Sequence, residues 1–181
     1  MTIYVALIRG INVGGRHTLP MKELRVVLER LGCRDVRTYI QSGNAVFGSG
    51  EEDGARLAGR IADEIGARRG FEPRVVALEL AEFERALEQN PFPDAETDAK
   101  GLHVAFLASV PERPDLAALD GLRSESERFR LRGAVFYLHA PAGVGRSKLA
   151  ASAEKLLGVP MTDRNWRTLC KLRELARELR P

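Results

Sequence analysis

Apolar residues recur at two spacings along the first half of the chain, and these spacings predict alternating strands and helices. The segment "IYVALIRG" is rich in β-branched and aromatic residues and predicts a strand, whereas Met21, Leu24 and Leu28 follow the three- and four-residue intervals of a helix. The full pattern predicts strands at 3–9, 35–40, 44–48 and 72–79 and helices at 21–31 and 57–65. Strand, helix, strand, strand, helix, strand is the order of the split βαβ, or ferredoxin-like, unit.

The second half repeats most of this order. A helix over 80–90 stops before Pro91, and the polar segment 93–101 is the best candidate for a connection. Beyond it the pattern predicts a strand at 102–109, a helix at 114–122, a hairpin at 128–140, a helix at 147–158 and, in place of a final strand, a long helix at about 164–179. We expect an α+β fold with two ferredoxin-like halves, 1–92 and 102–181, the second ending in this C-terminal helix. The halves could also form one compact unit.

The first predicted strand is apolar at both its odd and its even positions. A sheet with one face in water would alternate more cleanly between apolar and polar residues. We therefore expect both faces of this sheet to be covered, which argues against an open RNA-binding sheet.

Composition favours a cytoplasmic protein. Hydrophobic residues make up 44% of the chain, and no segment approaches the roughly 20 apolar residues of a membrane span. The start "MTIYVALIRG" has no basic leader, and Cys33 and Cys170 stand alone in the sequence. Each thiol is expected to fill a core and not to act as a nucleophile.

Charge is unevenly distributed along the chain. Residues 1–50 hold seven basic and three acidic residues, residues 51–122 eight and sixteen, and residues 123–181 thirteen and six. If the two basic ends meet in space, they form a surface that attracts anions, including nucleic acid. Codon bias towards arginine, which outnumbers lysine 23 to 5, explains the same pattern without a ligand.

Two loops in the first half offer groups for ligand binding. The loop "RGINVGGR", 9–16, could bring the backbone amides of Gly14 and Gly15 to an anion, or could be only a strained connection between a strand and a helix. In "TYIQSGNAVF", Gly43 and Asn44 are sufficient for a hairpin turn because both residue types tolerate positive φ. Gln41 and Ser42 are not required by that turn, so they are candidates for a site.

The segment "TDRNWRTLCKL", 162–172, begins the last predicted helix. Thr162 or Asp163 could cap it, and Arg164 and Lys171 would share one face. The simpler interpretation of this face is a basic surface in contact with water. Asn165 and Trp166 are unusual residues for such a surface, so both are candidates for a site. The Gly-rich segment "PAGVGRSKL", 141–149, resembles a phosphate cradle in composition only, since a helix cap explains its serine equally well.

Standard catalytic and metal-binding patterns are missing from the sequence. The three histidines have no metal-ligand spacing, and the G-x-S-x-G, G-x-G-x-x-G and P-loop motifs do not occur. We therefore expect no metal and no cofactor, and no residue can be assigned to catalysis.

Five segments together carry a resemblance to a known family: "LIRGINVGG", "MKELRVVLERLG", "VRTYIQSGNAVF", "NPF" and "TDRNWRTLCKL". Over residues 7–172 the chain resembles the bacterial family named domain of unknown function 1697. The resemblance implies an α+β fold with ferredoxin-like parts and no assigned biochemical function. Residues 9–15, 39–44 and 164–166 are the segments that identify it. Asp163 departs from the small or hydroxyl residue expected there, which argues against an anion site directly beside it.

Three hypotheses follow. The first is a small anionic or nucleotide-like ligand in a pocket shared by the first loop, the hairpin turn and the last helix. The second is a nucleic-acid-associated protein that uses the basic ends, and the third is an enzyme acting on a phosphorylated or acyl substrate. The ligand-binding candidates are Arg9, Asn12, Gly14, Gly15, Gln41, Ser42, Asn44, Arg164, Asn165, Trp166 and Lys171.

Overall fold

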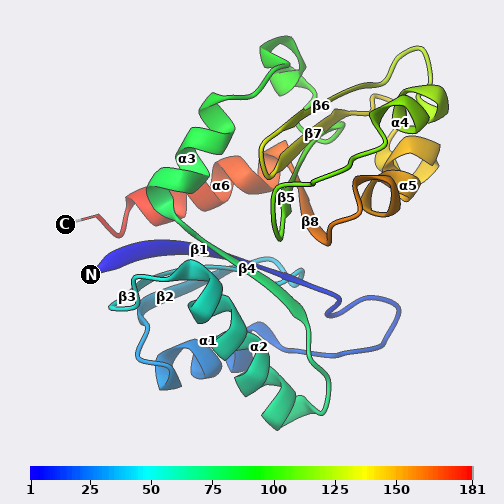
Figure 1. Cartoon of the computed structure of the whole chain (residues 1–181). Coiled ribbons are helices and arrows are strands. Elements are labelled where there is room, and N and C mark those ends of the chain that lie inside the picture. The colour runs from blue at the N-terminus through cyan, green and yellow to red at the C-terminus, as the bar shows by residue number, and fades with distance from the viewer. Residues whose placement is uncertain (181) are drawn as a thin grey trace. The chain divides into compact units, whose positions relative to one another are not determined.

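Strand β1 (Thr2–Arg9) is an inner strand of a four-stranded antiparallel sheet in the computed structural model, which describes residues 1–180. The sheet order is β2-β3-β1-β4, with β2 at Arg34–Tyr39, β3 at Asn44–Ser49 and β4 at Arg74–Glu79. Helices α1 (Met21–Arg30) and α2 (Gly54–Arg69) lie along one face of this sheet (Figure 1). This is the split βαβ arrangement that the sequence predicts.

The side chains of β1 alternate between the two faces of the sheet, and both sets are buried. Tyr4, Ala6 and Ile8 belong to a core cluster with apolar residues of α1 and α2. Val5 and Leu7 point to the opposite face and are also fully buried. Complete burial of a Val or Leu side chain stabilises a fold by about 1.5–3 kcal/mol. A strand whose two faces are both covered is therefore stabilised by apolar residues at every position, as in β1. The expectation of two covered faces is confirmed.

The second sheet repeats the first. Its order is β6-β7-β5-β8, formed by β5 (Leu102–Leu107), β6 (Arg128–Arg132), β7 (Val135–His139) and β8 (Met161–Asn165). Helices α4 (Leu116–Leu122) and α5 (Lys148–Leu157) lie on one face of it (Figure 1). Both halves are therefore ferredoxin-like, and the chain ends in helix α6 (Trp166–Arg177) as expected.

Strand β8 corrects the sequence prediction, in which the second half lacks a final strand. Its sequence "MTDRN" is polar because it is an edge strand, held by antiparallel pairing of its backbone with β5. Helix α6 accordingly begins at Trp166 and not near 164, and Arg164 lies in the strand. Neither Thr162 nor Asp163 caps the helix: the side-chain oxygen of Asn165 accepts a hydrogen bond from the backbone N–H of Thr168 at 2.9 Å.

The chain divides into two compact units. The first comprises Met1–Arg85 and the residues from Cys170 on, and the second comprises Ala86–Leu169. Within the first unit, Glu84 of helix α3 (Leu80–Glu88) accepts hydrogen bonds from Arg177 at 2.5 Å and from Arg180 at 2.6 Å.

The segment expected as a connection, 93–101, begins with the 3₁₀ helix η1 (Pro93–Thr97), in which Ala95 is buried. A second 3₁₀ turn, η2, covers Val144–Arg146. No helix within residues 1–180 has the length and apolar character needed to cross a membrane.

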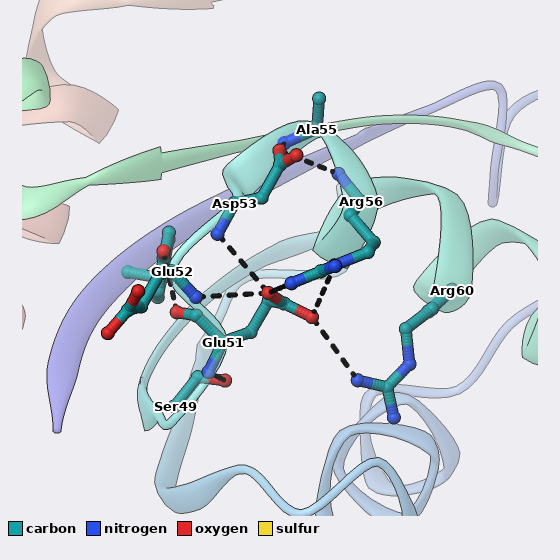
Figure 2. A network of polar contacts seen from close by, with 8 residues as sticks. Ser49, Glu51, Glu52, Asp53, Ala55, Arg56 and Arg60 are labelled. Atoms are coloured by element: carbon teal, nitrogen blue, oxygen red, sulfur yellow. Dashed lines mark hydrogen bonds and ion pairs between the residues drawn. The ribbon is translucent and has the colours of Figure 1, made fainter.

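Figure 2 shows a polar network that fixes the start of α2. The Asp53 carboxylate caps the helix by accepting hydrogen bonds from the backbone N–H groups of Ala55 and Arg56 at 2.9 and 3.0 Å. The side chain of Glu51, only 9% exposed, accepts from the Arg56 guanidinium and lies 3.7 Å from that of Arg60. Its backbone carbonyl accepts from the Tyr4 hydroxyl, which ties the network to β1.

We expect Glu51→Gln to destabilise the protein at neutral pH but not in acid. The hydrogen bond from Arg56 lowers the pKa of Glu51 to about 2. A lowered folded-state pKa contributes stability that is present above the unfolded pKa of about 4.3 and is lost as pH falls towards the folded value. Thermal melts of parent and variant should therefore differ at pH 7, approach each other as pH falls through about 4, and converge only below about pH 2, the folded-state pKa of Glu51. Glu52→Gln, at the exposed neighbouring position, is the control, and a difference that persists in acid would contradict the prediction.

Candidate functional site

The side chain of Asn12 holds the loop after β1 in one shape. Its oxygen accepts a hydrogen bond from the Leu19 N–H at 2.8 Å, and its nitrogen donates to the carbonyls of Leu19 at 2.8 Å and Gln41 at 2.7 Å. The residue itself has a φ of 55°, a left-handed conformation that asparagine tolerates better than most residues. The loop is thus closed on itself and attached to the hairpin turn, although Asn12 and Gln41 are 29 positions apart.

The tip of this loop explains its two glycines. Gly14 and Gly15 have φ values of 60° and 73°, and the flanking residues Val13 and Arg16 form a β-bridge. Two central residues with positive φ are typical of a type I′ turn, for which glycine is favoured. A Cβ at either position would meet nothing within 4 Å, so the space around this tip is open.

The hairpin turn between β2 and β3 packs directly against the end of β1. Gly43 has a φ of 77°, its carbonyl accepts from the Ile8 N–H at 2.7 Å, and a Cβ there would lie 2.9 Å from the Ile8 carbonyl oxygen. The prediction of left-handed geometry is right for Gly43 but wrong for Asn44. Ile40 is the other positive-φ residue of the turn, at 49°.

Asn44 shapes the turn through its side chain. It is fully buried, and its amide nitrogen donates to the Tyr39 carbonyl at 3.1 Å and to the Ser42 hydroxyl at 2.9 Å. Gln41 differs from it, since the Gln41 side chain is exposed and makes no hydrogen bond within residues 1–180; only its backbone carbonyl is used, by Asn12. The turn therefore needs the asparagine and leaves the glutamine side chain available.

Two arginines lie directly opposite each other where β1 and β4 meet. Arg9, the last residue of β1, pairs in register with Arg74, the first residue of β4, and both are exposed. Cross-strand neighbours of this kind have Cβ atoms about 4.5–5.5 Å apart, and like charges there are unfavourable. Arg74 is not among the residues that the sequence singles out. The ferredoxin-like strand order, which places the start of β4 beside the end of β1, could have identified it.

The other candidates fall into two groups. Lys171 of α6 belongs to the first unit and donates to Glu174 at 2.9 Å; Glu174 and, more weakly, Tyr39 at the end of β2 raise its pKa. Arg164, Asn165 and Trp166 belong to the second unit, where Asn165 caps α6 and Trp166 is buried in the core. The sequence places Arg164 and Lys171 on one helix face, which is wrong because Arg164 lies in β8. A pocket that joins the two groups stays a prediction.

The histidine and cysteine side chains have structural partners or are buried. The Nδ1 atom of His103 lies 2.8 Å from an Asp163 carboxylate oxygen and its Nε2 atom 2.9 Å from the Lys100 carbonyl oxygen, an arrangement of two acceptors that favours the protonated ring. Burial lowers the pKa of His103, but the bond and charge of Asp163 outweigh it and the pKa is raised. This pairing accounts for an aspartate at 163.

Burial raises the pKa of the Cys33 thiol to about 11. Residues 1–180 hold no group of three side chains placed for a metal ion.

Comparison with known proteins assigns a family to this geometry. Residues 1–137 match the family described as "Protein of unknown function (DUF1697)". The chain belongs to this family. A solved structure, the conserved bacterial protein SP0830 from Streptococcus pneumoniae, is 28% identical and covers 97% of this chain and 98% of its own, with a TM-score of 0.69. No curated protein matches the chain.

Two of the segments that identify DUF1697 in this sequence are therefore neighbours in space. Residues 9–15 and 39–44 are joined by the Asn12–Gln41 hydrogen bond and by the close packing of Ile11 on Gly43. The third segment, 164–166, lies beyond the matched residues 1–137 and in the other unit.

Proposed function

We propose that the first unit binds a small anionic, nucleotide-like ligand where β1 and β4 meet at the base of the Asn12 loop. The observation that carries this proposal is the register of Arg9 opposite Arg74. This register places the Cβ atoms of the two arginines on one face of the sheet, so a phosphate or carboxylate reached by both guanidinium groups would form charge-assisted hydrogen bonds with them.

The surrounding backbone supports the same proposal. The Asn12 hydrogen bonds fix the loop before any ligand arrives, so little conformational entropy is lost on binding. The exposed Gln41 side chain, next to the carbonyl that Asn12 binds, adds a donor and an acceptor for a polar ligand group. The proposed site comprises six residues that the sequence singles out, together with Arg74: Arg9, Asn12, Gly14, Gly15, Gln41 and Ser42. Lys171 interacts with Glu174 and Tyr39 and is not part of it.

We expect phosphate-bearing compounds to raise the melting temperature of the parent and not that of Arg74→Gln. A panel of inorganic phosphate, pyrophosphate, AMP and ATP would be tested by thermal shift, since a ligand at 100 times its Kd stabilises by about 2.7 kcal/mol. Gln41→Ala should change the melting temperature of the free protein little, within about 0.5 kcal/mol, yet weaken binding.

Arg25→Gln is the matched control, because Arg25 is an exposed arginine of α1 in the same unit. Equal loss in Arg25→Gln and Arg74→Gln would mean unspecific attraction by a basic surface. A panel in which no compound shifts the parent, or a compound that binds Arg74→Gln unchanged, would overturn the proposal.

A further inference from the structure

Strand β6 is an edge strand of the second sheet, and a groove runs along its free side. The groove has a volume of about 510 Å³ and is lined by Phe92, Leu116, Asp120, Arg123, Arg128, Phe129, Arg130 and Leu131. Four of these are consecutive residues of β6. Because side chains alternate between the two faces of a strand, a hollow that touches four in a row lies along its edge and not over one face.

The edge itself offers backbone groups for pairing. In an antiparallel ladder every second residue directs its N–H and C=O to the neighbouring strand, and the residues between them direct theirs away. Strand β6 pairs with β7 on one side, and the strand order places no strand on its other side in the described residues. The outward groups of β6 can therefore receive an added strand, as in recognition by β-augmentation.

The charges along β6 indicate which kind of strand could pair with its free edge. Arg128, Arg130 and Arg132 alternate with Phe129 and Leu131 in the sequence "RFRLR". Arg128 is bound to Asp94 at 2.7 Å and Arg132 to the Gln89 carbonyl at 2.8 Å. The Arg130 side chain is exposed, and its guanidinium group has no hydrogen bond or ion pair to any residue in the described range 1–180.

The other charges at the groove are already matched. Arg123 donates to Asp120 at 2.9 Å and to the Glu127 carbonyl at 3.1 Å, so Asp120, the one carboxylate of the lining, does not neutralise Arg130. A second copy of β6 would place arginine against arginine, which is unfavourable for direct cross-strand pairs. An acidic strand is the complementary occupant.

We propose that the free edge of β6 binds an extended segment of a partner protein as an added strand, with acidic residues alternating with apolar ones. The acidic side chains would lie beside Arg130 and its alternate neighbours, and the apolar ones beside Phe129 and Leu131. This site lies wholly in the second unit and does not depend on the anion site of the first.

The aromatic residues of the groove argue against single-stranded nucleic acid as the occupant. Such binding relies on exposed rings on which bases stack. The Arg128 guanidinium already covers the Phe92 ring, 4.8 Å from its centroid. Phe129 packs on Phe136 with centroids 5.8 Å apart and joins the core of the second sheet.

The test measures fluorescence anisotropy of labelled, end-blocked peptides with the full-length protein. The probe is a nine-residue peptide that alternates glutamate and valine. The comparisons are a peptide of the same composition with its glutamates in one block, an alternating lysine–valine peptide, and oligothymidylate. Two further probes carry N-methyl groups on one or the other alternate set of backbone amides, because only one set would pair with β6.

We expect the alternating acidic peptide to bind, the lysine peptide not to bind, and one N-methylated form to lose at least tenfold in affinity while the other does not. Arg130→Glu should weaken binding at least tenfold, and it should fold because Arg130 has no partner to lose. Arg113→Glu, at another exposed arginine of the second unit, should bind as the parent does. Equal binding of the block peptide, indifference to Arg130→Glu or to both N-methylations, or binding of oligothymidylate alone would overturn the proposal.

Discussion

Gly43→Ala is expected to lower the free energy of unfolding by about 3 kcal/mol or more. A left-handed φ costs an L-residue roughly 1–2 kcal/mol, and overpacking a well-packed site costs roughly 1–3 kcal/mol more. The new Cβ would lie 2.7 Å from Cδ1 of Ile11, 2.9 Å from Cβ of Ile8 and 2.9 Å from the Ile8 carbonyl oxygen. The Ile11 methyl can rotate away, but the Ile8 atoms are held by the sheet, and moving them breaks the hydrogen bond from Ile8 to Gly43.

Two alanine variants separate these contributions in urea unfolding followed by circular dichroism. Gly14→Ala shares the positive φ, at 60°, but its Cβ meets nothing, so it measures conformational strain alone. Gly59→Ala, inside α2 with open space around it, should stabilise the protein by about 0.5–1 kcal/mol. If Gly43→Ala is no less stable than Gly14→Ala, the turn does not pack on β1 as described.

Asn44→Ala should lower the free energy of unfolding by about 1–3 kcal/mol, which is the usual cost of leaving a buried polar group unpaired. The substitution removes the donor to the Tyr39 carbonyl and to the Ser42 hydroxyl inside a site with no exposure. Asn44→Asp should be worse, because a carboxylate has no proton to donate to Tyr39 and would be a buried charge.

Gln41→Ala is the matched comparison, three positions away in the same turn and exposed. Urea unfolding of the three variants should rank them Gln41→Ala, Asn44→Ala, Asn44→Asp in increasing loss. A large loss in Gln41→Ala would assign the glutamine to the turn and remove it from the proposed ligand site.

The sequence was sufficient for elements whose apolar pattern is strong and local. The continuous apolar run of β1 and the helical spacing of α1 predict both the elements and the doubly covered sheet. Strand β8 was missed because "MTDRN" has no such pattern: its conformation depends on pairing with β5, more than 50 residues earlier in the chain. The misplaced start of α6 follows from that omission, since residues assigned to the helix belong to the strand.

The same difference between local and long-range features applies to the candidate site. Composition identified the loop of Asn12 and the turn of Gln41, but not the hydrogen bond between them, because it joins residues 29 positions apart. Arg9 was identified by its place at a strand end. Its neighbour Arg74 is found only through the strand order and register of the sheet, since nothing in the local sequence marks one strand's first residue as the partner of another strand's last.

The first unit is formed by two segments that are far apart in the sequence, and this has a consequence for biosynthesis. A ribosome delivers all four strands of the first sheet within residues 1–79, whereas the partners of Glu84, Arg177 and Arg180, follow it in the sequence by 93 and 96 residues. The nascent chain therefore carries Glu84 without these cations while the whole second unit is synthesised. The first unit is therefore complete only after the residues from Cys170 on have been translated, so a truncation before Cys170 would harm this unit although the sequence of its sheet is intact.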